Sequence, residues 1–377
     1  MYKSIAIVLA AIVVSLSAVA CGTEAVTADP VKPAAWSAQS SGSSAALTDV
    51  AFPNATHGWA VGDDGTILAT ANGGSTWSAQ SSGSSEILTG VAFPNATHGW
   101  AVGDGGTILA TANGGSTWSA QSSGSSARLH GVAFPNATHG WAVGDDGTIL
   151  VTRNGGATWK AQRSGRRASH EQGTTLVFTN GVATAKVRNA WRTASLGAVA
   201  FSDATHGWAV GSFADKMTGV ILSTTNGGAT WRAQSPGRGV WLFDVAFPSA
   251  THGWAVGIDG NGMGGGGGGG GGVILATTNG GATWSRQRSV KLVGFDAVAF
   301  SDATHGWAVG THYLPYAGVI LATTNGGATW RAQSSGSRAS LTDVAFSDAT
   351  HGWAVGYDDS KTGAGVILAT TNGGAPR

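Results

Sequence analysis

Apolar and polar residues recur along this chain in one repeated order. A unit such as VAFPNATHGWAVGDDGTILATANGGSTWSAQSS holds four short apolar stretches separated by residues that favour turns. Within residues 47–82, LTDVAF, HGWAVG, TILATA and TWSAQS predict four strands, and PNAT, DDG and NGGS predict the turns between them. Strands this short, at a period near 41 residues, indicate repeated small antiparallel sheets.

The tripeptide His-Gly-Trp marks seven copies of the unit, beginning at His57, His98, His139, His206, His252, His305 and His351. Six copies end in a Thr-Trp strand, at Trp77, Trp118, Trp159, Trp231, Trp284 and Trp330. The seventh copy stops at NGGAPR, and an isolated AAWSAQSS around Trp36 supplies the missing strand. We therefore predict an all-β, seven-bladed β-propeller of four-stranded blades, closed by the N-terminal strand, so that no sheet edge is left open.

The third turn of each unit carries a recognisable motif. Residues 70–77, TANGGSTW, match the Asp-box or bacterial neuraminidase repeat, Ser/Thr-x-Asp/Asn-x-Gly-x-Thr-Trp. The Asx side chain of such a turn bonds backbone amides, and the Gly supplies a positive φ. We assign a structural role to Asn72, Asn113, Asn154, Asn226, Asn279 and Asn325. The seventh copy is truncated after Asn372.

The N-terminus predicts export. A Lys precedes an apolar run over residues 5–20, which is too short for a membrane span, so residues 1–20 are interpreted as a signal peptide. The single cysteine, Cys21, follows Ala18-Val19-Ala20 and is interpreted as a lipidation site, with ordinary secretion as the alternative. Residues 21–35 are polar and Ala-rich and suit a flexible tether, so the propeller is assigned to residues 36–377.

The repeats differ at two kinds of connection. A 26-residue insertion, within about 163–195, separates the third and fourth blades, and its sequence predicts a hairpin turning at Asn180-Gly181 or a disordered loop. The loop between the second and third strands is longer in blades four to seven. Both connections leave a propeller on the same face, so we predict one working face there. The poly-Gly run at 264–272 is expected to be a flexible expansion without a specific role.

Charge is also unevenly distributed. Residues 153–338 hold 16 Lys/Arg and 7 Asp/Glu, whereas residues 22–152 hold 2 and 9. The predicted partner-binding residues are Arg163, Arg166, Arg167, Arg188, Arg192, Arg232, Arg238, Arg286, Arg288 and Lys291. Such a basic region attracts an acidic protein, an anionic lipid surface or an acidic glycan, unless it is simply a solvated surface. Nucleic acid is disfavoured because no aromatic residues interleave the basic run.

Catalysis is not predicted. The seven repeated His residues lie on a ring and are assigned hydrogen-bonding roles, so neither a metal nor a cofactor is expected. Glycoside hydrolysis usually needs a carboxylate pair, and the chain has three Glu residues. Asp49, Asp244, Asp296 and Asp343 are interpreted as one repeated position of the first strand.

The repeated HGWAVGDDGTILATANGGSTW units of residues 36–377 resemble the photosystem II stability/assembly factor family. The resemblance implies a non-catalytic, exported seven-bladed propeller, often a lipoprotein, that binds a newly made membrane protein through a basic patch. A monomer with a protein partner is therefore expected. The alternatives are a cell-surface glycan-binding propeller, for which Trp191, Trp241, Tyr313 and Tyr316 are the candidate aromatics, and an Asp-box glycosidase with a carboxylate pair on the loop face.

Overall fold

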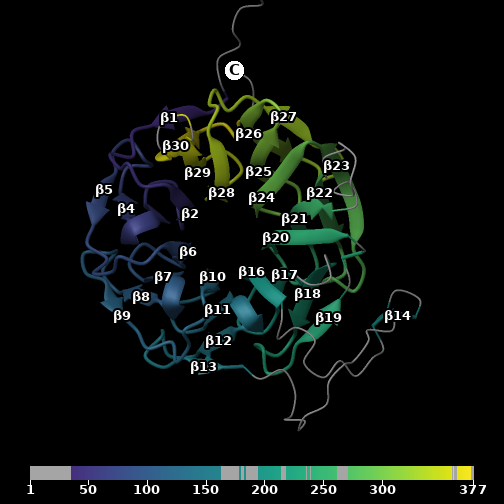
Figure 1. Cartoon of the computed structure of the whole chain (residues 1–377), viewed down its shortest axis with the longest axis horizontal. Coiled ribbons are helices and arrows are strands. Elements are labelled where there is room, and N and C mark those ends of the chain that lie inside the picture. The colour runs from purple at the N-terminus through teal and green to yellow at the C-terminus, as the bar shows by residue number, and fades with distance from the viewer. Residues whose placement is uncertain are drawn as a thin grey trace, which may run out of the picture. The chain divides into compact units, whose positions relative to one another are not determined.

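The strands form a ring of seven four-stranded antiparallel sheets in the computed structural model (Figure 1). The structure describes residues 35–162, 178–179, 182–183, 194–213, 218–234, 236–237, 239–260, 271–358, 360 and 363–374. Each sheet is one blade, with its first strand innermost and its fourth outermost. The predicted all-β propeller is confirmed.

The first three blades have short strands. Blade one consists of β2 (Leu47–Ala51), β3 (Gly58–Gly62), β4 (Ile67–Thr70) and β5 (Ser78–Gln80). Blade two consists of β6 (Leu88–Ala92), β7 (Gly99–Gly103), β8 (Ile108–Thr111) and β9 (Ser119–Ala120). Blade three consists of β10 (Leu129–Ala133), β11 (Gly140–Gly144), β12 (Ile149–Thr152) and β13 (Lys160–Ala161). Short 3-10 turns, η1 (Asp63–Gly65), η2 (Asp104–Gly106) and η3 (Asp145–Gly147), join their second and third strands.

Blades four to seven have longer inner strands. Blade four consists of β16 (Ala194–Phe201), β17 (Gly207–Phe213), β18 (Thr218–Thr224) and β19 (Arg232–Gln234). Blade five consists of β20 (Val240–Ala246), β21 (Gly253–Asp259), β22 (Gly271–Thr277) and β23 (Ser285–Lys291). Blade six consists of β24 (Val293–Phe300), β25 (Gly306–Tyr313), β26 (Tyr316–Thr323) and β27 (Arg331–Gln333). Blade seven consists of β28 (Ser340–Phe346), β29 (Gly352–Asp358), β30 (Ala364–Thr370) and β1 (Ser37–Gln39).

The N-terminal strand closes the ring as predicted. β1 pairs antiparallel with β30, with Ser37 opposite Ala369. Trp36 is buried, its ring meets Phe346 edge to face at 5.7 Å, and its indole Nε1 donates a hydrogen bond to Gln333 Oε1 at 2.9 Å. The first and last described parts of the propeller are thus held together by both sheet pairing and side-chain packing.

Aromatic stacking fixes each blade against its neighbour. The Phe that ends each first strand stacks on the His-Gly-Trp indole of the preceding blade, as Phe134 does on Trp100 at 3.5 Å and 4°. The same Phe meets the outer Trp of its own blade edge to face, as Phe134 meets Trp159 at 5.8 Å. A Cβ on Gly140 would overlap the Phe134 ring, so the Gly of His-Gly-Trp is required for this packing.

The connections separate into two faces. The turns after the first and third strands meet on what we call the short-turn face, where Gly73 N–H donates to Thr56 C=O at 2.8 Å. The connections after the second and fourth strands meet on the opposite long-loop face, where Asp63 N–H donates to Ala46 C=O at 3.1 Å. Every length difference between the described connections therefore lies on the long-loop face.

Much of the predicted loop length is strand. In blade six, β25 and β26 pair as far as Tyr313 opposite Tyr316, so the segment predicted as a loop forms a hairpin that prolongs the sheet. The poly-Gly prediction is wrong at its last two residues, because Gly271 and Gly272 pair with Asp259 and Ile258 in blade five. Residues 264–270 lie outside the described part of the chain.

The insertion contains the paired strands β14 (Phe178–Thr179) and β15 (Val182–Ala183), which flank Asn180-Gly181 as the hairpin prediction requires.

The Asp-box asparagines hold the turn between the third and fourth strands. In the turn of blade one, Asn72 Oδ1 accepts hydrogen bonds from Thr76 N–H at 2.9 Å and from Thr70 Oγ1 at 2.9 Å. Asn113, Asn154, Asn226, Asn279 and Asn325 accept the same two bonds. Among the described residues, no helix has the length and apolar character needed to cross a membrane.

Candidate partner-binding surfaces

Four of the ten predicted basic residues lie within the described ranges. Arg232 begins the outer strand β19 opposite Ser223, at the short-turn end of blade four. Arg286, Arg288 and Lys291 all belong to the outer strand β23 of blade five. Arg163, Arg166, Arg167, Arg188, Arg192 and Arg238 lie outside the described residues. The four described residues therefore lie along the outer edge of two blades, and only Lys291, at the end of β23, reaches the long-loop face.

Two of these basic side chains have partners within the molecule. Arg286 Nη1 lies 2.7 Å from Asp259 Oδ2, an ion pair between the outer and second strands of blade five. Arg288 Nη1 donates to Trp330 C=O at 3.3 Å and so contacts blade six. Lys291 is exposed. Of the four predicted basic residues that the structure describes, Lys291 is thus the one placed to meet a partner on the long-loop face.

The hairpin of blade six carries the exposed apolar surface. Among the described residues, the exposed large hydrophobic side chains are Tyr313, Leu314 and Tyr316, at 45%, 70% and 45% exposure. All three lie at the tip of the β25–β26 hairpin. Tyr313 N–H donates to Leu292 C=O at 2.8 Å, which holds the tip beside Lys291. We call Lys291, Tyr313, Leu314 and Tyr316 the hairpin tip; it combines one basic and two aromatic residues.

The remaining glycan candidates are less accessible. Trp241, in β20, is half-buried, and its indole Nε1 is buried without a hydrogen-bond partner in the described structure. Trp191 lies outside the described residues. Tyr313 and Tyr316 are therefore the candidate aromatics that the structure places on the surface.

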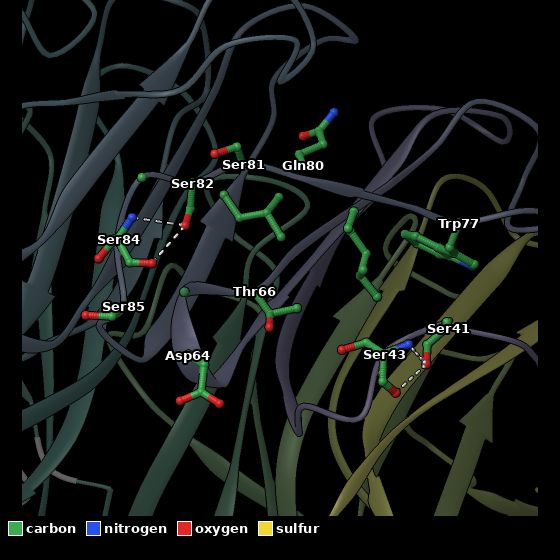
Figure 2. Close-up of a pocket in the computed structure, with 16 residues that line it drawn as sticks. Ser41, Ser43, Asp64, Thr66, Trp77, Gln80, Ser81, Ser82, Ser84 and Ser85 are labelled. Atoms are coloured by element: carbon green, nitrogen blue, oxygen red, sulfur yellow. Dashed lines mark hydrogen bonds between the residues drawn. The ribbon is translucent and has the colours of Figure 1, made fainter.

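A serine-rich groove lies on the long-loop side of blade one (Figure 2). Its volume is about 710 Å³, and it runs between the linker at Ser41–Ser43 and the linker at 81–85, over Asp64 and Thr66. Ser41 Oγ accepts from Ser43 N–H at 3.2 Å, and Ser82 Oγ accepts from Ser84 N–H at 3.2 Å. These two hydroxyls therefore stabilise their own turns.

The central channel contains the carboxylates considered for glycoside hydrolysis. It is a cavity of about 330 Å³ lined by Asp49, Asp244, Asp296 and Asp343. Asp49 Oδ2 accepts from Val91 N–H of the next blade at 2.6 Å, and Asp343 and Asp49 share a side-chain hydrogen bond. Bonds of this kind join first strands of neighbouring blades, so they indicate a structural role for these carboxylates.

Asp296 does not occupy the position of the other three, contrary to the sequence interpretation. Asp49, Asp244 and Asp343 pair with Val61, Val256 and Val355, whereas in blade six Ala297 takes this position opposite Val309. Asp296 lies one residue earlier, in the β-bulge that interrupts the first strand of every blade. Thr48 occupies this bulge in blade one and donates to Leu88 C=O at 2.6 Å.

Burial governs the ionisation of the channel carboxyls. It raises the pKa of Asp244 and of Asp296 to about 7 each. Burial, reinforced by the neighbouring Asp49, raises the pKa of Asp343 well above the ordinary range, and burial also raises the pKa of Asp49. The Asp49–Asp343 pair therefore retains a proton where isolated carboxyls would be ionised.

A Ser, a His and an Asp meet between blades three and four. Ser195 Oγ donates to Asp145 Oδ1 at 2.7 Å, and His130 Nε2 lies 2.9 Å from the same oxygen. Burial opposes ionisation of Asp145, but the bonds from Ser195 and His130 outweigh it and lower its pKa. A serine hydrolase needs Ser and Asp on different nitrogens of the imidazole, whereas both approach Nε2 here. The cluster is suited to joining the blades, not to activating Ser195.

The seven repeated His residues lie in turns on the short-turn face. His57 Nδ1 lies 2.9 Å from Thr56 Oγ1, and the other six His residues contact the preceding Thr in the same way. In the part of the chain that the structure describes, no group of three or more His, Cys, Asp or Glu residues is arranged to hold a metal ion.

Comparisons with known proteins agree with this architecture. The family described as photosynthesis system II assembly factor YCF48 matches residues 28–120, which extend to the end of blade two. No curated protein matches the sequence of the chain. The resemblance to photosystem II assembly factors predicted from the repeats is thus confirmed in sequence over the first part of the propeller.

Solved structures extend the comparison to the whole ring. YCF48 bound to D1 peptide aligns with a TM-score of 0.62 and 20% identity, covering 89% of this chain and 97% of that one. YCF48 from Cyanidioschyzon merolae aligns at 0.63 and 23%, covering 89% and 98%. The GH74 xyloglucanase from Xanthomonas campestris aligns at 0.63 and 16%, covering 90% of this chain and 54% of that one. At these identities the likeness establishes the shared propeller fold.

Proposed function

We propose that this chain is a non-catalytic propeller scaffold that binds a segment of a protein partner on its long-loop face. The observation that carries the proposal is the hairpin tip. Exposed Tyr, Leu and Tyr side chains beside a Lys form the amphipathic kind of contact that protein interfaces favour, on a surface with no other exposed large hydrophobic side chain among the described residues.

The comparisons support the same role. The sequence of blades one and two resembles the photosystem II assembly factors, and one solved relative in fold is bound to a D1 peptide. By analogy, we propose that the partner is a membrane protein with a segment exposed outside the cytoplasm. The channel carboxylates bond backbone amides of neighbouring blades, which favours a scaffold over a glycosidase.

Export and anchoring belong to the proposal. The apolar run before Cys21 favours secretion with a lipid on this cysteine, which would hold the propeller near the membrane that contains the partner. Membrane fractionation tests the anchor: the intact chain is expected in the membrane fraction, and the Cys21→Ser variant in the soluble one. Equal distribution of both proteins would contradict lipidation of Cys21.

Capture from solubilised source membranes tests the docking role. The bait is the chain from residue 22 onward, compared with a Leu314→Asp variant and with Ala328→Asp, which places the same charge on an exposed turn at the other face of blade six. We expect Leu314→Asp to lower recovery of a defined membrane protein by about tenfold or more, and Ala328→Asp to leave it unchanged. Equal recovery with all three baits would exclude the hairpin tip, and recovery of polysaccharide alone would favour the glycan-binding alternative.

A further inference from the structure

The serine-rich groove of blade one lies where the second and third strands of that blade end early. β3 and β4 are joined by the three-residue turn η1, and their pairing extends only to Val61 opposite Ile67. In blade six the corresponding strands pair as far as Tyr313 opposite Tyr316. The shorter hairpin of blade one leaves a groove between the two serine-rich linkers on the long-loop face (Figure 2).

Four polar side chains line the groove without a hydrogen bond to another described residue. They are Asp64, Thr66, Ser81 and Ser85. Asp64, Ser81 and Ser85 are exposed, and Thr66 is half-buried, so a ligand can reach all four. These groups differ from the linker hydroxyls described above, which are occupied by their own turns.

The chemistry of these four groups favours a ligand that carries hydroxyls. Each Ser or Thr hydroxyl both donates and accepts a hydrogen bond, whereas the Asp64 carboxylate accepts only. A sugar hydroxyl can satisfy both kinds of group, because it also donates and accepts. Among the described residues that line the groove, none is Lys, Arg or His. An anionic ligand would therefore meet Asp64 without a compensating positive charge.

An aromatic side chain supplies apolar surface to the same groove. Trp77 is half-buried and lines the groove. Its indole Nε1 donates to Gln39 Oε1 at 3.2 Å, and its ring meets Phe52 edge to face at 5.8 Å, so its position is fixed by the fold. Figure 2 shows Asp64 and Thr66 between Trp77 and the serines of the far linker. A fixed aromatic ring suits the C–H face of a sugar.

The groove is large and open enough to admit such a ligand. Its volume of about 710 Å³ falls within the usual range of ligand sites and is sufficient for a disaccharide. The glycines at the tips of the two linkers leave the entrance clear, because a Cβ built on Gly42 or Gly83 would meet no atom within 4 Å.

We propose that this groove binds a neutral saccharide. The Asp64 carboxylate accepts hydrogen bonds from sugar hydroxyls, the hydroxyls of Thr66, Ser81 and Ser85 exchange hydrogen bonds with others, and Trp77 packs against a ring. The site belongs to blade one, whereas the hairpin tip belongs to blade six, so it does not rest on the docking role proposed above.

The repeats supply matched variants for the test. Asp64 has a left-handed φ of 55°, and Gly105 takes the same place in the turn of blade two at 63°. Asp64→Gly therefore removes the carboxylate and is compatible with the turn. Asp146 has the same conformation in blade three, with a φ of 55°, but does not line the groove, so Asp146→Gly is the control. Thr66→Val provides a second variant, which removes one hydroxyl and keeps the branched shape.

The test uses the intact protein and small neutral sugars. The probes are cellobiose, maltose and N,N′-diacetylchitobiose, with the cationic peptide Ac-Ala-Lys-Ala-NHCH₃ for comparison. The readout is the indole ¹H–¹⁵N signal of Trp77, assigned with Trp77→Phe. We expect a disaccharide to shift this signal saturably, and Asp64→Gly to weaken its binding by about tenfold, because hydrogen bonds to a charged group are lost. Thr66→Val should weaken it less, and Asp146→Gly and Leu314→Asp should leave it unchanged.

Three results would overturn the proposal. One is a Trp77 signal that none of the three disaccharides shifts. Another is tighter binding of the cationic peptide than of any disaccharide, which would assign the groove to a positively charged ligand. The third is equal binding of the disaccharide by the parent and by both Asp64→Gly and Thr66→Val, because the sugar would then occupy another part of the surface.

Discussion

Asp343 Oδ2 in β28 accepts a hydrogen bond from the backbone N–H of Val50 in β2 at 2.9 Å, although the residues lie 293 positions apart in the chain. This bond joins the innermost strands of blades seven and one, while Trp36 and Gln333 join the outer strands of blades six and seven. Asp244 makes the equivalent contact with Val298 at 2.8 Å between blades five and six. Channel carboxyls therefore contribute to ring closure, and their protonation affects stability.

The channel predicts that stability falls as the pH rises from about 4 to 7. Burial raises the pKa of Asp244 from 3.8 to about 7, so the folded protein binds more protons than the unfolded chain across this window. The stabilisation from the neutral form is complete below pH 3.8 and is lost as the pH rises through 7. Asp244→Asn, which cannot ionise, should therefore gain thermal stability relative to the parent between pH 5 and pH 8, as measured by Tm.

Asp49, Asp296 and Asp343 are present in both proteins, so the difference in Tm reports the carboxyl of Asp244 together with its effect on the pKa of the neighbouring Asp343. A difference that does not change between pH 5 and pH 8 would show that Asp244 is ionised in the folded protein at both values.

The short-turn face predicts the opposite behaviour in acid. Asp302 Oδ1 accepts from His305 N–H at 2.9 Å and from Thr304 N–H at 2.6 Å, and although burial opposes ionisation, these bonds hold its pKa below the ordinary value of 3.8. The resulting stabilisation is present above pH 3.8 and is lost as the pH falls below it. Asp302→Asn should therefore lose less stability than the parent between pH 7 and pH 2.5.

Blade one supplies the control for that substitution. Asn54 accepts the same two backbone bonds, from Thr56 and His57 at 3.0 and 2.9 Å, so an amide is compatible with the turn. If Asp302→Asn and the parent lose equal stability in acid, measured as the change in Tm, then Asp302 does not contribute to acid sensitivity.

The glycine of His-Gly-Trp predicts a steric requirement. A Cβ at Gly140 would overlap the Phe134 ring, which is held against Trp100 at 3.5 Å. Gly140→Ala should lower the free energy of unfolding by about 1–3 kcal/mol or more, through displacement of this ring. Combining it with Phe134→Leu should recover part of the loss, and strictly additive losses in denaturant unfolding would argue against the steric explanation.

The fold was predictable because the sequence of a blade is repeated seven times. The strands, the closure at Trp36 and the division of the connections between two faces all follow from counting these repeats. Side-chain positions within a blade depend on pairing registers that counting does not give. Asp296 shares a sequence context with Asp49 but lies in the bulge, one residue from the equivalent position. Likewise Arg232 and Lys291 lie near opposite ends of their strands, on two blades, although both belong to one basic part of the sequence.

The β-bulge at Gln287 was not predictable for the same reason. The sequences TWSAQS and TWSRQR place Gln at the same distance from Trp. Only the pairing of β23 with β22 shows that Gln287 is the extra residue of a β-bulge. The neighbouring Arg286 and Arg288 were predicted from the sequence to bind a partner. In the structure they bond Asp259 and Trp330, on either side of the bulge.

The Gln residues near the outer strands predict different costs for the same substitution. Gln121→Ala removes the acceptor of Trp159 Nε1 at a half-buried site and should lower the free energy of unfolding by about 1–3 kcal/mol. Gln287→Ala removes an exposed side chain that makes no hydrogen bond to another described residue, and should change stability by less than about 0.5 kcal/mol. Urea unfolding of both variants measures the difference. A large loss for Gln287→Ala would mean that Gln287 bonds Trp330 in solution, as Gln121 bonds Trp159.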